Sequence, residues 1–173
     1  VFEPGSTQKA LTVAAAIEEG LVAPDSRLQV ADSIRIGGKS FTDISRRGTE
    51  QWTLTDIIER SSNVGTIMVA EELGAERLDT YLREFGYGSA LGVGFPGESS
   101  GMLMPVEDWW QTSLPTIAIG HGVGVSLLQL ANSYATLAND GVAVQPRVVR
   151  GTVGEDGRLT PAAEGSRRQV VSP

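Results

Sequence analysis

Two residues near the start of the chain could perform acyl-transfer chemistry. Ser6 and Lys9 stand at positions i and i+3 of a segment with helical spacing, so their side chains lie on one face. A serine hydroxyl needs a base beside it, and a lysine amine whose pKa is lowered by burial can serve. The start of a helix also favours negative charge on a nearby oxygen. The pair therefore predicts a nucleophile and its base.

A second motif, Ser61-Ser62-Asn63, lies between two apolar helical patterns. The Ser61 hydroxyl could relay a proton to a leaving amine, and the Asn63 carboxamide could hold both the lysine and a substrate carbonyl. Each motif alone also has a plain structural explanation. Ser6 could cap a helix beside a solvated lysine, and Ser61 to Asn63 could form an ordinary turn between helices.

The elements that must position these residues can be read from spacing, caps and breakers. The pattern predicts a helix from Ser6 to Gly20, a short capped helix after Thr53, and extended segments with turns between 22 and 49. Further helices are expected over 64–73, 75–85 and 126–138, a long glycine-rich loop over 86–105, and a hairpin over 147–159. In the 126–138 helix the apolar stripe comprises Leu127, Leu130, Ala131, Tyr134 and Leu137 or Ala138.

Composition excludes several classes of function. The 173 residues carry a net charge of -7, which argues against nucleic acid as a partner because phosphate neutralisation needs clustered basic residues. With no cysteine and the single histidine His121, disulfides, thiol catalysis and multi-histidine metal sites are excluded. The chemistry above needs no metal and no organic cofactor. The longest apolar stretch, 11–17, is far shorter than the ~20 residues that span a bilayer.

The order of several short segments resembles a known family. Glu3-Pro4-Gly5-Ser6-Thr7-Gln8-Lys9 and Arg60-Ser61-Ser62-Asn63-Val64-Gly65 are similar to two motifs of the transpeptidase domain of class B penicillin-binding proteins, the septal or elongation peptidoglycan synthases. Three further matches follow in order, at 85–88, at 95–101, and at 118–122 with 128–131. The resemblance spans nearly the whole chain.

The resemblance implies specific roles and surroundings. Ser6 would be the acylated nucleophile, Lys9 its base, Ser61 the proton relay and Asn63 a substrate-holding amide. Substrates would be peptidoglycan stem peptides, and β-lactams would acylate the same serine. The family works at the outer face of the cytoplasmic membrane, so a membrane anchor and other cell-wall or division proteins would be partners outside this chain.

One family motif is missing from the sequence. No Lys-Thr-Gly or Lys-Ser-Gly occurs, because the only lysines are Lys9 and Lys39. We therefore expect residues 1–173 to form part of an α/β transpeptidase-like domain, mainly its helical part, with the central antiparallel sheet incomplete. The strands before Val1 and the catalytic strand after Pro173 would be absent, so the fragment itself would be inactive.

The sequence is compatible with two other functions. A serine β-lactamase shares the first two motifs but must activate water, and the Glu-x-x-x-Asn pattern of its class A members fails at both Glu98 and Glu107. A binding or sensing domain would keep the fold without turnover. We expect His121 to be a loop or wall residue, and the pair Arg46-Arg47 to be solvated.

Overall fold

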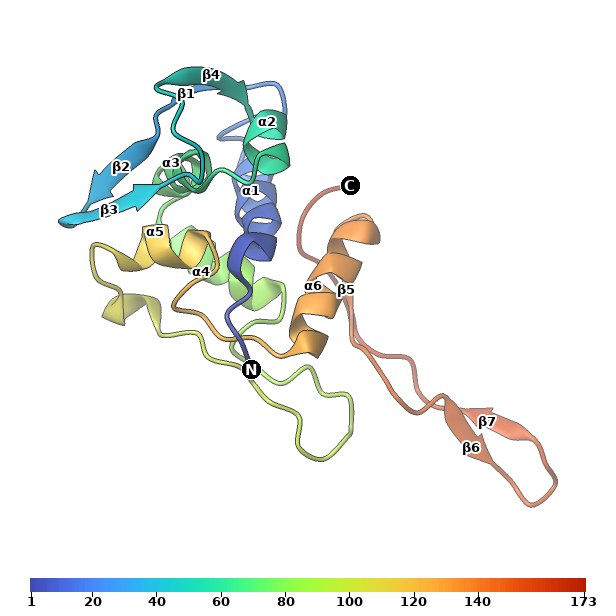
Figure 1. Cartoon of the computed structure of the whole chain (residues 1–173). Helices are drawn as coiled ribbons and strands as arrows, with labels where there is room; N and C mark the ends of the chain where they lie inside the picture. The colour runs from blue at the N-terminus through green and yellow to red at the C-terminus, as the bar shows by residue number, and fades with distance from the viewer.

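Helix α1 (Lys9–Glu18) runs through the middle of the molecule in the computed structural model, which describes residues 1–173 (Figure 1). A turn of 3₁₀ helix, Gly5–Gln8, leads directly into it. Leu11 and Ala15 pack into one hydrophobic cluster, whereas Val13 and Ala16 pack into another. The helix is therefore buried on more than one face. This packing fixes the direction of Lys9, the first residue of α1, and of the 3₁₀ turn before it, which carries Ser6.

The predicted extended region forms two antiparallel ladders beside α3 (Figure 1). The β2–β3 connection is Gly37-Gly38 with positive φ at both positions, as a tight two-residue hairpin turn requires. Strands β1 and β4 pair so that Leu28 lies opposite Trp52. Their bounds are β1 Arg27–Val30, β2 Ser33–Ile36, β3 Lys39–Thr42 and β4 Glu50–Thr53.

Three helices follow, and all three were predicted. Thr53 caps α2 (Leu54–Glu59) in a reciprocal capping box with Asp56. Helix α3 (Asn63–Leu73) is capped by Ser62 and ends at Gly74, and α4 is Ala75–Glu84. Helix α3 packs against α1, so the Ser61 turn at its start lies near the first turn of α1.

One helix was missed, α5 (Ser113–Ala118). Its third residue is Pro115, which usually signals a break. In the first turn of a helix the absent N–H has no intrahelical acceptor to lose, so proline is tolerated there. A further 3₁₀ turn, η2, spans Val106–Asp108.

Helix α6 (Leu127–Ala138) occurs where predicted, but its most deeply buried residues lie to one side of the predicted stripe. Leu130 and Leu137 of the predicted stripe pack against the core, but Leu127 is 72% and Tyr134 40% exposed. Gln129, Ser133 and Thr136 are buried instead. The reason is the glycine-rich loop 86–105, whose carbonyl groups need donors. Gln129 Nε2 lies within hydrogen-bond distance of the Gly86, Ser89 and Ser100 carbonyl oxygens.

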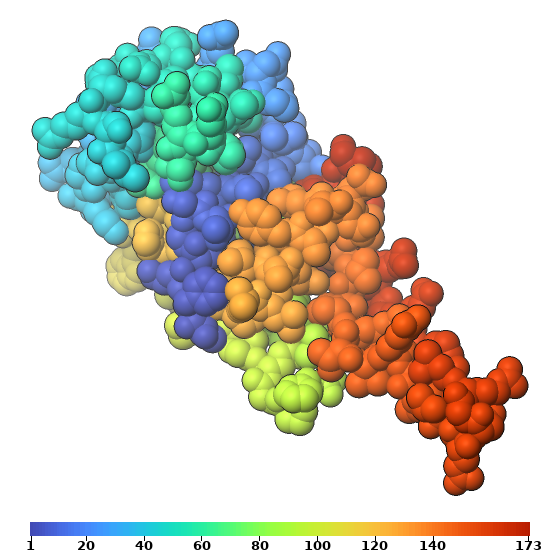
Figure 2. Space-filling model, turned by 45° about the vertical axis from the view of Figure 1, so that its right-hand side comes forward, coloured from blue at the N-terminus to red at the C-terminus, as the bar shows by residue number.

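The predicted hairpin projects from the body as an arm (Figures 1 and 2). It consists of β6 (Gly151–Val153) and β7 (Leu159–Pro161). At its base β5 (Val142–Val144) pairs with β8 (Arg167–Gln169). All strands thus belong to separate two-stranded antiparallel ladders, with no continuous sheet among them. None of the helices is long and apolar enough to cross a membrane.

Candidate active site

The Ser6 segment is held by main-chain contacts with a distant loop. Phe2 pairs with Val125 in an isolated β-bridge, and the Gly5 N–H donates to the Gly120 carbonyl at 2.9 Å. Gly120 has a φ of +83°, and a Cβ there would lie 2.1 Å from the Gly5 carbonyl oxygen, so only glycine fits. Ser6 is exposed and its hydroxyl makes no hydrogen bond within the chain. It is free to meet a substrate.

Lys9 is only 2% exposed, although lysine is rarely buried. Its ammonium nitrogen lies 2.5 Å from the Ser61 carbonyl oxygen and 3.1 Å from the Ser61 hydroxyl, across 52 residues of sequence. No hydrogen bond joins Lys9 to Ser6 in this structure. The lysine therefore links the start of α1 to the turn before α3.

Burial changes the protonation of Lys9. Loss of hydration lowers the pKa of its amine, and the nearby Asp43 carboxylate opposes that effect in part. A lower pKa increases the population of the neutral amine at physiological pH. Only the neutral amine can accept a proton, so the environment favours a basic function for Lys9.

Ser61 occupies an unusual backbone conformation. Its φ is +53°, in the left-handed region that residues other than glycine seldom adopt. In this geometry the Ser61 carbonyl points at Lys9, and the next residue, Ser62, is the N-cap of α3. Ser62 accepts a hydrogen bond from the Gly65 N–H at 2.9 Å. The Ser-Ser-Asn break is thus a shaped turn whose carbonyl faces the lysine.

Asp43 holds this turn from the other side. Its carboxylate accepts hydrogen bonds from the Ser62 hydroxyl at 2.7 Å and the Val64 N–H at 3.0 Å. Arg47 Nη2 donates to the same carboxylate at 2.9 Å. The Asp43 side chain is 6% exposed, so removing it would leave several donors without a partner.

Arg47 is not solvated as expected. Its side chain is 13% exposed, and its guanidinium carbon lies 3.6 Å from the centroid of the Trp52 ring. The expectation was wrong because the indole face and Asp43 together replace the water that the guanidinium loses. Neither Asp43 nor Arg47 was found as a site residue, since no local motif links them to Ser61.

Asn63, the fourth predicted site residue, starts α3 and donates from Nδ2 to the Thr42 carbonyl at 2.9 Å. It makes no hydrogen bond to Lys9. The fold therefore brings Lys9 and Ser61 into direct contact and places Ser6 and Asn63 on the elements that carry them. Glu3 binds His121 Nδ1 at 2.9 Å, which fits the expected loop position of that histidine.

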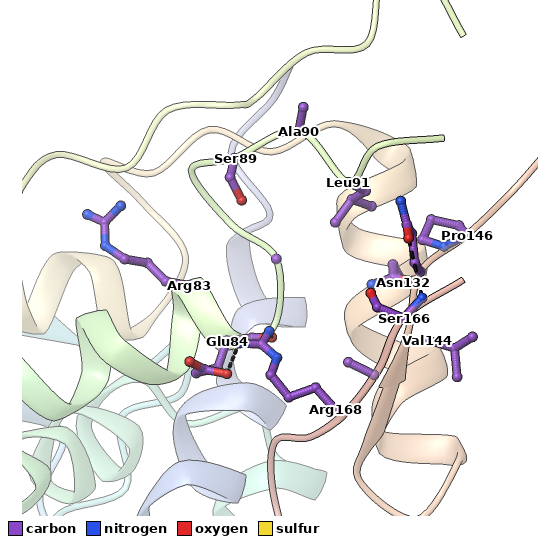
Figure 3. Close-up of a pocket in the computed structure, with 13 residues that line it drawn as sticks. Arg83, Glu84, Ser89, Ala90, Leu91, Asn132, Val144, Pro146, Ser166 and Arg168 are labelled. Carbon is purple, nitrogen blue, oxygen red and sulfur yellow. Dashed lines mark hydrogen bonds and ion pairs between the residues drawn. The ribbon is translucent and has the colours of Figure 1, made fainter. Parts of the chain in front are cut away.

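A separate polar cavity of about 260 Å³ lies between the end of α4, the start of the 86–105 loop and the β5–β8 ladder (Figure 3). None of the four predicted site residues lines it. Its cation Arg168 is paired with Glu84, and Arg83 forms a double hydrogen bond with Asp79. This cavity is not the centre of the predicted chemistry.

Comparison with known families agrees with the motifs. Residues 1–173 match the family described as the penicillin binding protein transpeptidase domain. The chain belongs to that family. This confirms the resemblance drawn from the sequence to class B penicillin-binding proteins.

Individual relatives are similar over almost the whole chain. Penicillin-binding protein PbpB of Mycolicibacterium smegmatis is 46% identical over 172 residues, covering 99% of this chain and 26% of the relative. Peptidoglycan D,D-transpeptidase FtsI of Escherichia coli is 38% identical over 143 residues, covering 82% of this chain and 24% of the relative. The chain thus spans about a quarter of the length of these curated relatives.

A solved structure shows the same fold. Penicillin binding protein 3 of Mycobacterium tuberculosis, complexed with aztreonam, superposes with a TM-score of 0.95 at 42% identity. The match covers 99% of this chain and 38% of that one. The predicted α/β transpeptidase-like fold, seen mainly as helices with short antiparallel strands, is confirmed.

Proposed function

We propose that the protein containing this chain is a serine D,D-transpeptidase that cross-links peptidoglycan stem peptides. The single observation that carries the proposal is the contact of the buried Lys9 amine with Ser61, next to an exposed Ser6. Residues 1–173 would form part of the penicillin-binding transpeptidase domain.

In the proposed reaction Ser6 attacks the penultimate D-Ala carbonyl, and neutral Lys9 takes the hydroxyl proton. An ester forms to Ser6, and the bond to the terminal D-Ala breaks as a proton passes to its amine through Ser61. An amine of a second stem then attacks the ester and regenerates the Ser6 hydroxyl. Ser6 and Lys9 are not hydrogen-bonded in the free structure, and such contacts often tighten only with substrate.

The positions of Ser61 and Asn63 support the roles proposed for them. Ser61 Oγ is 3.1 Å from the Lys9 amine, close enough for proton transfer between them. Asn63 commits one amide hydrogen to Thr42, which leaves the amide oxygen and a second hydrogen for a substrate main chain.

β-Lactams would be inhibitors because they acylate the same serine. The structure similar to this chain is a complex with aztreonam, and another of the same protein contains ampicillin. By the same reasoning the protein would act at the outer face of the cytoplasmic membrane in cell-wall synthesis and division, anchored through a segment outside this chain and working with other proteins there.

The β-lactamase alternative needs a carboxylate that activates water. Glu98 binds the N–H groups of Leu91, Gly92 and Val93, so it organises the loop. Glu107 lies in the exposed turn η2. Neither carboxylate makes a hydrogen bond to Ser6, so we favour transfer to an amine over hydrolysis.

The test is intact mass of the full-length protein after incubation with penicillin, followed by peptide mapping. We expect one adduct on Ser6, none in Ser6→Ala, and acylation slowed by at least about 100-fold in Lys9→Met. Adding a D-amino acid should trap a transfer product from a D-Ala-D-Ala peptide. Rapid penicillin hydrolysis would favour the β-lactamase alternative, and a stable adduct without transfer would favour a binding domain.

A further inference from the structure

A small cavity of about 160 Å³ opens beside the proposed proton relay. Seven residues line it: Asp43, Ile44, Ser45, Arg47, Trp52, Arg60 and Ser61. This volume has room for a few water molecules or one short side chain. Ser61, which contacts Lys9, is part of the lining, so the cavity adjoins the proposed proton relay.

The two arginines of this cavity differ in their pairing. Arg47 is bound to Asp43 at 2.9 Å and lies 4.0 Å from both Asp32 and Glu50. Arg60, the residue before Ser61, is exposed and has no carboxylate oxygen within 4.0 Å. It therefore offers an available guanidinium at the edge of the cavity.

Nearby acidic groups are already bound by other donors. The Asp56 carboxylate accepts from the Thr53 N–H and hydroxyl, and Asp43 accepts from Ser62, Val64 and Arg47. Glu50 accepts from the Trp52 indole N–H at 2.9 Å. An added anion would find its strongest free partner in Arg60.

Packing also orients Arg60. Its guanidinium carbon lies 5.1 Å from the Trp52 ring centroid, on the ring that also stacks against Arg47. Ile44, which is 97% exposed, adds an apolar wall to the same cavity. A ligand with a short methylene stem and a terminal carboxylate matches these surfaces, with its stem on Ile44 and its oxygens on Arg60.

We propose that Arg60 and the cavity beside Ser61 form a subsite for an acidic side chain of the peptide substrate. The inference rests on the proposed transpeptidase function, since it assigns a specificity residue to that site. Binding of the carboxylate would hold the peptide beside the Lys9–Ser61 pair. It would also distinguish a free carboxylate from its amide, which lacks the charge that guanidinium recognises.

The experiment uses the full-length protein and two synthetic peptides ending in D-Ala-D-Ala. One has a glutamate residue with a free side-chain carboxylate, and the other has glutamine in its place. Each peptide competes with a fluorescent penicillin for labelling of Ser6, and release of terminal D-Ala is measured in parallel. We expect the wild type to prefer the acidic peptide by roughly three- to tenfold.

Arg60→Gln should remove this preference while fluorescent labelling without peptide persists, and Arg60→Lys should retain part of it. The matched control is Arg46→Gln, which removes an exposed arginine from a loop position lining a different cavity. It should keep the full preference.

The two proposals fail in different ways. Absence of Ser6 labelling in the wild type would overturn the proposed function. Normal labelling with equal competition by both peptides, or with no competition by either, would overturn the subsite alone. So would a preference that Arg60→Gln leaves intact.

Discussion

The Ser62 hydroxyl donates to Asp43 at 2.7 Å, and this bond fixes the turn that presents Ser61 to Lys9. Ser62 cannot move without affecting its neighbour, because it also caps α3. Asp43 lies 19 residues earlier, on the loop after β3. A residue outside the proposed chemistry thereby controls the position of the proton relay.

Replacing Asp43 should therefore affect both stability and acylation. Asp43→Ala leaves the largely buried Arg47 and the Ser62 and Val64 donors without their acceptor, at a cost of about 3 kcal/mol. Urea unfolding measures the loss, and penicillin labelling of Ser6 should slow in parallel. Asp32→Ala, which removes a more exposed carboxylate that also binds this loop, is the control and should cost less. Equal losses of stability and of labelling rate in both variants would contradict the claim that Asp43 fixes the turn at Ser61.

The pH dependence of acylation should reflect the lowered pKa of Lys9. The neutral amine is the base, so the labelling rate should rise with pH and level off below the ordinary lysine value of 10.5. A profile of the second-order rate constant for penicillin labelling measures this inflection. An inflection at or above the ordinary value would show that burial does not tune this lysine.

The same pKa predicts the sign of a stability change. In the folded state Lys9 binds its proton less tightly than in the unfolded state, so the unfolded chain holds more protons between the two pKa values. The contribution of Lys9 to stability should thus increase as pH rises through that window. Urea unfolding of the wild type and of Lys9→Met across alkaline pH measures this contribution as the difference between their free energies of unfolding. A difference that does not change with pH would contradict the lowered pKa of Lys9.

Two buried glutamines offer a matched pair of substitutions. Gln8 is fully buried and neither polar atom of its side chain has a partner, whereas Gln129 is bound at both ends. Gln8→Met should be neutral or stabilise the fold by about 1 kcal/mol. Gln129→Met should cost about 2–3 kcal/mol because loop carbonyl groups lose their donor. Destabilisation by both substitutions, measured by urea unfolding, would mean that Gln8 has a partner in the protein.

Gly120 should tolerate no side chain. Gly120→Ala combines a positive φ with a clash at the Gly5 carbonyl, so the segment before Ser6 must move. We expect a loss of about 2 kcal/mol or more and slower labelling of Ser6. Gly122→Ala is the control, since it also has positive φ but its Cβ would meet nothing closer than 3.7 Å. Similar labelling rates in the two variants would exclude a role for the Gly5–Gly120 contact.

The sequence alone determined the elements whose signals are local. The capping boxes at Thr53 and Ser126, the Gly37-Gly38 turn and the glycine-rich loop act over a few residues, so their types and order were predictable. The two motifs were visible for the same reason, because each is contained in one helical turn or one break between helices.

Only the tertiary structure decided how the motifs meet. Lys9 reaches Ser61 across 52 residues because α1 packs against α3, and Ser62 meets Asp43 across a further loop. The buried face of α6 was predicted only in part, at Leu130 and Leu137, since the burial of Gln129 depends on the carbonyl groups of the 86–105 loop that it satisfies. Such contacts depend on how elements pack and on which polar groups must be paired, and neither is encoded within a short stretch of sequence.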